Sequence, residues 1–276
     1  MNRAYITHAT KKYLHVAHNL ATSIREFSDI PVVVYCFDVD KKDTYIFQNI
    51  ENVYSEVIQL NLDHPDEYPL APSGNFYVPR HDARSFNVLS AKVLAMKKSL
   101  ESGWDEICYL DSDCIATPTV DELFDWIDLV EDYPIGTKGI HEYMTIFEDG
   151  IALGNPFEGT WPAADNTKCL EWPLMNFMEM SPNQRGNYHT TGIMLMNKNC
   201  LDFINLWWDL CKILPKLTNI KMIAPFQEET VYNALAWKKG NGGFPLCYIN
   251  LDNGVETVKD FYNNDHKEGG FVNYND

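Results

Sequence analysis

The first 60 residues alternate between short apolar runs and a helix-like periodicity, and this alternation limits the chain to few fold classes. Residues 4–8 form a short apolar segment that ends in polar residues, and they lead into residues 13–27, where apolar side chains recur every three or four positions. Residues 31–37 are rich in β-branched and aromatic side chains, and residues 53–60 show a weaker strand pattern. Strands that alternate with helices predict an α/β fold with a largely parallel sheet. We interpret this part of the chain as a nucleotide-binding half.

The alternation of expected strands and helices continues along the chain. No internal repeat is present in the sequence. Residues 63–84 contain several prolines and are expected to form a surface excursion, because the α/β pattern resumes directly after them. Residues 137–187 are rich in glycine, proline and aromatic residues, which suits a substrate-binding wall. The remaining expected elements are strands at residues 107–110 and 192–196 and helices at residues 85–100, 120–129, 201–214 and 228–237. A chain of 276 residues, 45% of them hydrophobic, can bury the core of one large domain.

The charge balance argues against a nucleic-acid partner. The chain has 39 Asp and Glu residues against 22 Lys and Arg residues, a formal net charge of −17. Such a chain repels polynucleotide phosphates and anionic membranes. To bind a phosphorylated small molecule it needs a metal ion or a few well-placed cations.

The cysteine pattern and the apolar runs favour a cytoplasmic protein. None of the seven cysteines forms a CxxC pair, and several lie in apolar runs, as expected for reduced core residues. The chain has no Asn-x-Ser/Thr sequon, and its apolar runs are too short to span a bilayer. We therefore expect a cytoplasmic protein without stable membrane insertion, and the sequence leaves its oligomeric state open.

The acidic segment Asp111-Ser112-Asp113 directly follows the apolar run at residues 107–110. Ligands of open α/β sheets bind at the carboxyl ends of the strands. In an extended chain, two aspartates one residue apart point the same way and can share a hard cation such as Mg²⁺ or Mn²⁺. The alternative is a solvated turn or a helix cap, in which Asp and Ser are common.

The order of these motifs resembles a known family. The initial strand and helix are followed by a long helix with Arg84 and Lys92 and then by the segment ICYLDSD at residues 107–113. The segments YHTTGIMLMN and QEETVYN follow at residues 188–197 and 227–233. Together they are similar to the GT-A fold glycosyltransferases, specifically the glycogenin and galactosyltransferase-like group, over residues 4 to about 249.

The resemblance implies a fold, an activity and a cofactor. It predicts a single GT-A (Rossmann-like) domain over residues 1–276, with a mixed, mostly parallel central sheet flanked by helices. Residues 1 to about 130 would form the nucleotide-sugar donor half, and residues from about 131 to 276 the acceptor half and C-terminal tail. The implied activity is a metal-dependent sugar transferase of EC class 2.4. It would move a sugar from a UDP-sugar to a glycan or other hydroxyl acceptor, with Mn²⁺ or Mg²⁺ as cofactor.

The resemblance also assigns roles to individual residues. Asp111, Asp113 and His266 would bind the metal, and Glu228 and Glu229 would act in catalysis. Donor-binding roles fall on Thr7, His8, Ala9, Asp38, Arg84, Lys92, Ser112, Thr191 and Gly192.

Each assignment has a structural alternative. Thr7 and Asp38 suit a cap or a turn, and His266 suits a solvated tail. Arg84 and Lys92 lie eight residues apart on one helix face and can be surface charges. Acidic residues such as Glu228 and Glu229 are favoured in the first turn of a helix by its dipole.

Aromatic side chains in the middle of the chain have two alternative roles. Trp161, Trp172 and Tyr188 can stack on acceptor sugars or pack irregular loops.

Two other functions fit part of the pattern. The apolar run followed by Asp111 and Asp113 also resembles the opening of a haloacid-dehalogenase-like phosphatase, with Asp111 as nucleophile and Asp113 as acid. That family places the motif on its first strand, whereas an α/β unit precedes it here. The second alternative is a sugar-binding protein that has lost catalysis. Neither a Walker A loop nor a GxGxxG fingerprint is present, which disfavours nucleotide kinases and dinucleotide oxidoreductases.

Overall fold

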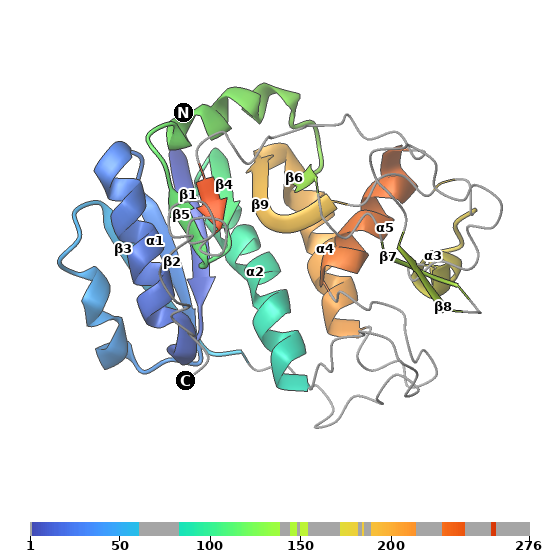
Figure 1. Ribbon diagram of the computed structural model, residues 1–276, viewed down its shortest axis with the longest axis horizontal. Coiled ribbons are helices and arrows are strands. Elements are labelled where there is room, and N and C mark those ends of the chain that lie inside the picture. The colour runs from blue at the N-terminus through green and yellow to red at the C-terminus, as the bar shows by residue number, and fades with distance from the viewer. Residues whose placement is uncertain are drawn as a thin grey trace.

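A six-stranded sheet runs through the protein in the order β3-β2-β1-β4-β9-β6 (Figure 1). The computed structural model describes residues 2–60, 83–138, 144–147, 150–153, 172–181, 184, 189–213, 228–240 and 255–257. The strands are β1 (Arg3–Ala9), β2 (Val32–Phe37), β3 (Val53–Ile58), β4 (Glu106–Leu110), β6 (Ile135–Lys138) and β9 (His189–Asn197). Strands β1 to β4 pair in parallel, whereas β9 runs antiparallel to both β4 and β6. The sheet is therefore mixed and mostly parallel, as the sequence predicts.

The central strands are buried on both faces because they are almost entirely apolar. Every residue of β2 and β4 is buried, and β3, at the edge, is largely exposed. Continuous apolar runs of this kind are typical of parallel strands covered on both sides. In the register of the sheet, Ala9 pairs with Cys36, and Ile6 pairs with Tyr109. The carboxyl ends of β1, β2 and β4 therefore open at the same edge.

Helices cover both faces of the sheet. The α-helices are α1 (Leu14–Phe27), α2 (Ala83–Glu101), α3 (Trp172–Phe177), α4 (Leu201–Ile213) and α5 (Glu228–Gly240). Ser99 of α2 donates to the Tyr35 hydroxyl at 3.1 Å, which places α2 on the face that carries Tyr35 and its register neighbour His8. The Tyr5 hydroxyl donates to Val120 O at 3.0 Å. Because side chains alternate along β1, Tyr5 and the 3₁₀ helix η3 (Val120–Leu129) lie on the opposite face.

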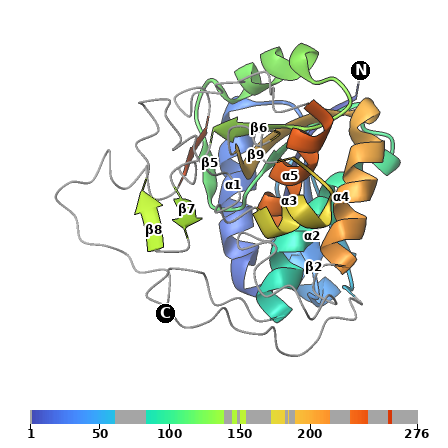
Figure 2. The same ribbon diagram turned by 90° about the vertical axis from the view of Figure 1, so that its right-hand side faces the viewer.

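Smaller elements complete the described structure. Short 3₁₀ helices η1 (Lys11–Tyr13) and η2 (Lys41–Phe47) follow β1 and β2, and η8 (Lys198–Cys200) follows β9. Strand β5 (Cys114–Ala116) pairs with β10 (Val255–Thr257), and β7 (Met144–Phe147) pairs with β8 (Gly150–Leu153). Helices α3 and α4 both pack on α5 (Figure 2), and α5 packs on β9.

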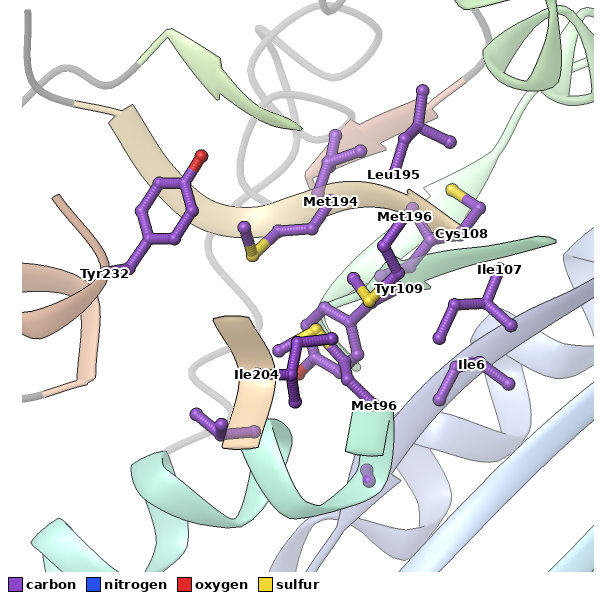
Figure 3. Close-up of a cluster of buried hydrophobic side chains, with 14 of the residues drawn as sticks. Ile6, Met96, Ile107, Cys108, Tyr109, Met194, Leu195, Met196, Ile204 and Tyr232 are labelled. Atoms are coloured by element: carbon purple, nitrogen blue, oxygen red, sulfur yellow. The ribbon is translucent and has the colours of Figure 1, made fainter. Parts of the chain in front are cut away.

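The core beneath β9 is rich in methionine. Met194 and Met196 of β9 lie with Met96 of α2 and Ile204 of α4 in a continuous apolar cluster (Figure 3). All four side chains are buried, and flexible methionines fill the irregular space where an antiparallel strand joins parallel ones. The described cysteines are free thiols buried in the same core, as expected from the sequence: Cys36, Cys108, Cys114, Cys200 and Cys211.

Most expected elements occur, with three differences. The helix expected at residues 120–129 is a 3₁₀ helix, and the strand expected at residues 192–196 begins three residues earlier and ends one later. Helix α2 begins at Ala83, inside the segment expected to be a surface excursion. The rest of that excursion and most of residues 137–187 lie outside the described residues.

Candidate active site

The acidic segment lies at the carboxyl end of β4, as the sequence predicts, but it is not extended. The backbone N–H of Cys114 donates to Asp111 O at 3.0 Å, which closes a four-residue turn. The expectation that Asp111 and Asp113 point the same way through strand alternation is therefore wrong, because that alternation ends with β4. The turn is anchored to the neighbouring strand, since the Asp111 N–H donates to Gly192 O at 2.7 Å.

The carboxylate of Asp111 is held by two side chains. Lys92 Nζ lies 3.0 Å from Asp111 Oδ1. The Tyr109 hydroxyl donates to the same oxygen at 2.7 Å. Burial alone would raise the pKa of Asp111, but the Lys92 charge and the Tyr109 hydrogen bond hold it below its usual range. Asp111 is therefore ionised at neutral pH.

Lys92 links three elements at this site. Its ammonium group comes from α2 and lies 3.3 Å from both Glu228 Oε1 of α5 and Thr191 Oγ1 of β9. Its side chain is 4% exposed, and an ammonium group has three protons to donate. Burial alone would lower the pKa of Lys92, but the charges of Asp111 and Glu228 outweigh it and raise the pKa above its ordinary value. Lys92 thus carries a buried positive charge, not a surface charge.

The two glutamates at the start of α5 face β9. The Thr191 N–H donates to Glu229 Oε2 at 3.0 Å, and the Thr191 hydroxyl lies 3.4 Å from Glu228 Oε1. Burial raises the pKa of Glu228, although Lys92 opposes the shift. Burial and the Glu228 charge raise the pKa of Glu229 to about 8. These residues do occupy the first helical turn, but their burial and contacts exceed what the helix dipole alone requires.

An asparagine that the sequence reasoning missed fixes α5 to β9. Asn233 is fully buried, and its amide oxygen accepts the His189 N–H at 2.8 Å. Its amide nitrogen donates to His189 O at 2.8 Å and to Glu229 O at 2.9 Å. Asn233 lies one helical turn after Glu229, and this spacing is the one sequence signal that pointed to it.

The expected donor-binding residues of β1 lie at the same edge of the sheet. His8 Nδ1 is 2.7 Å from the Tyr109 hydroxyl, which connects β1 to Asp111 through one tyrosine. Thr7 is buried, and its hydroxyl oxygen has no hydrogen-bond partner among the described residues. Ala9 is the last residue of β1.

Asp38 has a structural role beside this edge. Its Oδ1 accepts the Leu60 N–H at 2.8 Å, and its own N–H donates to Ile58 O at 2.9 Å. Its φ of 54° is accessible to aspartate, which tolerates the left-handed region better than most residues. One carboxylate oxygen of Asp38, Oδ1, therefore has the turn-forming role that was the structural alternative for this residue.

The carboxylate groups of Asp111 and Asp113 at the turn are of the ligand type that suits a hard divalent cation. Partial burial and the neighbouring Asp111 charge raise the pKa of Asp113, so the two carboxyl groups repel each other. A divalent cation relieves that repulsion, and carboxylate oxygens are its preferred protein ligands. Within the described ranges, no group of three or more His, Cys, Asp and Glu side chains is arranged to hold a metal.

Several predicted residues cannot be placed. Arg84 lies in the first turn of α2, and Trp172 begins α3, but their side chains lie outside the described part of the structure. His266, Trp161 and Tyr188 lie wholly outside the described residues. Ser112 occupies the turn between the two aspartates and is partly buried.

The fold matches that of a solved glycosyltransferase. No family model matches the chain, and no curated protein matches its sequence. The galactosyltransferase LgtC in complex with donor and acceptor sugar analogs matches with a TM-score of 0.51 and 14% identity, over 84% of this chain and 70% of that chain. The expected fold is thereby confirmed: an α/β domain of the GT-A kind with a mixed, mostly parallel sheet.

Two other solved structures are similar over the same share of this chain. The bifunctional glycosyltransferase WbbM in its apo form matches with a TM-score of 0.48 and 15% identity, over 84% of this chain and 37% of that chain. An active-site mutant of LgtC matches with a TM-score of 0.48 and 13% identity, over 84% and 69%.

A helix that crosses a membrane has to be long and apolar. Within the described part of the chain, no helix is both long and apolar enough to cross a membrane.

Proposed function

We propose that the chain is a metal-dependent glycosyltransferase that moves a sugar from a UDP-sugar to a hydroxyl group of a glycan or other acceptor. The observation that carries this proposal is the position of Asp111 and Asp113. They lie at the carboxyl end of β4, beside the end of β1, in a chain with the fold of a galactosyltransferase. Open α/β sheets bind their ligands at this edge.

In the proposed site, Asp111 and Asp113 hold Mn²⁺ or Mg²⁺. When bound, the ion supplies positive charge that stabilises the departing diphosphate. The buried ammonium of Lys92 adds a second positive charge beside Asp111. Residues Thr7 to Ala9 end β1 next to this position, where the nucleotide would bind.

We further propose that the glutamates of α5 act on sugar hydroxyls. Glu228 Oε2 is buried and has no hydrogen-bond partner among the described residues. A buried carboxylate oxygen of this kind is costly unless a ligand donates to it, and a sugar hydroxyl is such a donor. Glu229, whose pKa is raised to about 8, is mostly protonated at neutral pH, and its ionised fraction can accept the proton of an acceptor hydroxyl.

The phosphatase alternative has no support in the fold. Asp111 follows the fourth strand of the chain, whereas the phosphatase reading requires the motif on the first strand. A galactosyltransferase structure, in contrast, matches the fold with a TM-score of 0.51.

A thermal-shift screen tests the proposal. The protein is heated with UDP, GDP or CDP, each with and without Mn²⁺, because a ligand that binds the native state raises the melting temperature. We expect UDP with Mn²⁺ to raise it most, and UDP alone to have little effect. If no nucleotide stabilises the protein in the presence of metal, the proposal fails. Release of phosphate from a generic phosphate ester would favour the phosphatase instead.

A further inference from the structure

The hydroxyl group of Tyr109 has two hydrogen-bond partners. It lies two residues before Asp111 on β4, is fully buried, and donates to Asp111 Oδ1 at 2.7 Å. The same hydroxyl lies 2.7 Å from Nδ1 of His8, which comes from the neighbouring strand β1. The three side chains therefore form a chain of two short hydrogen bonds that ends at a carboxylate.

The direction of this chain follows from counting protons. A tyrosine hydroxyl has one proton to donate, and an ionised carboxylate can only accept. Asp111 Oδ1 lies 3.0 Å from Lys92 Nζ as well as 2.7 Å from the Tyr109 hydroxyl, so it accepts from both groups. The Tyr109 proton is thus committed to Asp111, and its oxygen must accept from His8. His8 therefore carries a proton on Nδ1.

Packing holds both rings of this chain in place. The His8 and Tyr109 rings stack with centroids 6.0 Å apart at 29°. Phe37 meets His8 edge-on at 6.1 Å, and Lys92 Nζ lies 5.6 Å from the centre of the Tyr109 ring. A hydroxyl fixed this firmly restricts the rotation of the carboxylate that it contacts.

We propose that Tyr109 is a positioning residue for the cation ligand Asp111, and that the protonated Nδ1 of His8 directs the Tyr109 proton toward that carboxylate. The inference rests on the proposed function, because it concerns the same cation site. Hydrogen-bond partners that orient metal ligands typically change metal affinity 10- to 100-fold when they are removed. The Tyr109 hydroxyl is such a partner, and it does not itself contact the ion.

The first test measures Mn²⁺ affinity in the absence of nucleotide, from the electron paramagnetic resonance signal of the free ion. Tyr109→Phe removes the hydroxyl and keeps the ring. Tyr35→Phe is the matched control. Tyr35 belongs to β2, lies on the same face of the sheet as Tyr109 and is equally buried, and its hydroxyl accepts from Ser99, away from the site. We expect Tyr109→Phe to bind Mn²⁺ about 10-fold or more weakly than wild type, and Tyr35→Phe to match wild type. Equal affinities in two folded variants would overturn the proposal.

The second test is independent of metal. Nitrogen-15 chemical shifts distinguish a protonated from an unprotonated imidazole nitrogen, and the His8 signals are assigned by comparison with His8→Gln. We expect a protonated Nδ1 in the wild type. An unprotonated Nδ1 would overturn the proton order even if Mn²⁺ binds. A wild-type protein that binds no Mn²⁺ but has a protonated Nδ1 would overturn the cation site and the positioning role while leaving the hydrogen-bond chain intact.

Discussion

Lys92 and Glu228 form an ion pair of 3.3 Å in which each side chain is only 4% exposed. The pair joins α2 to α5 beneath the acidic turn at Asp111. Asp111 and Glu228 share the single ammonium group of Lys92, so their negative charges are compensated only while Lys92 is present.

Removing Lys92 should destabilise the fold strongly. Lys92→Met leaves the buried Glu228 and the partly buried Asp111 without their cation, and breaking a buried pair on one side typically costs about 3–5 kcal/mol. Urea unfolding measures the loss. Lys98→Met is the control, because Lys98 lies on the same helix in a 3.9 Å surface pair with Glu56 and should cost less than about 1 kcal/mol. Equal losses in the two variants would contradict the buried network.

Removing the Glu228 charge should rescue part of that loss. The double variant Lys92→Met with Glu228→Gln leaves one uncompensated carboxylate in place of two, so it should unfold at a higher urea concentration than Lys92→Met alone. The same urea titrations provide the comparison. An unchanged or lower midpoint would show that Glu228 does not depend on Lys92.

The stability should depend on pH through Glu229. Burial and the Glu228 charge raise its pKa in the folded protein to about 8, so folding favours its protonated form. The resulting stabilisation is present below the ordinary carboxyl pKa and is lost as the pH rises toward and through 8. Glu229→Gln cannot lose a proton, so its stability should fall less than that of wild type between pH 5 and pH 8. Urea unfolding across this range checks the slope, and the exposed Glu101→Gln should keep the wild-type slope.

Asn233 should control the attachment of α5 to β9. Asn233→Ala leaves the His189 N–H and the carbonyls of His189 and Glu229 without their amide partner. Each unsatisfied buried group costs about 1–3 kcal/mol, so we expect a clear drop in the melting temperature and faster hydrogen exchange at the His189 amide. The exposed Asn176→Ala should change neither. Unchanged hydrogen exchange at the His189 amide would contradict the role of Asn233 in attaching α5 to β9.

Local patterns predicted the N-terminal strands and helices well. The apolar runs of β1, β2 and β4 and the periodicity of α1 are strong signals, because they reflect burial on both faces of a sheet and on one face of a helix. The short strands β5 and β10 escaped prediction, since three residues give too little pattern to distinguish a strand from a loop. The start of β9 at His189 was missed because Asn233, far along the chain, fixes it.

The candidate site was predictable in its residues but not in its connections. Asp111 and Glu228 were recognised as acidic candidates, yet no local pattern indicates that Lys92 lies between them. Tyr109 appeared in the sequence as one more apolar strand residue, because a tyrosine in a buried strand contributes the same pattern whether or not its hydroxyl binds a carboxylate. Contacts between distant elements decide such roles.

Isothermal titration of UDP tests the central claim most directly. Wild type, the double variant Asp111→Asn with Asp113→Asn, and the exposed control Asp125→Asn are titrated with and without Mn²⁺. We predict that wild type and the control bind UDP only when Mn²⁺ is present, and that the folded double variant does not bind it. Absence of UDP binding by wild type with Mn²⁺, or equal binding by the double variant, would contradict the account.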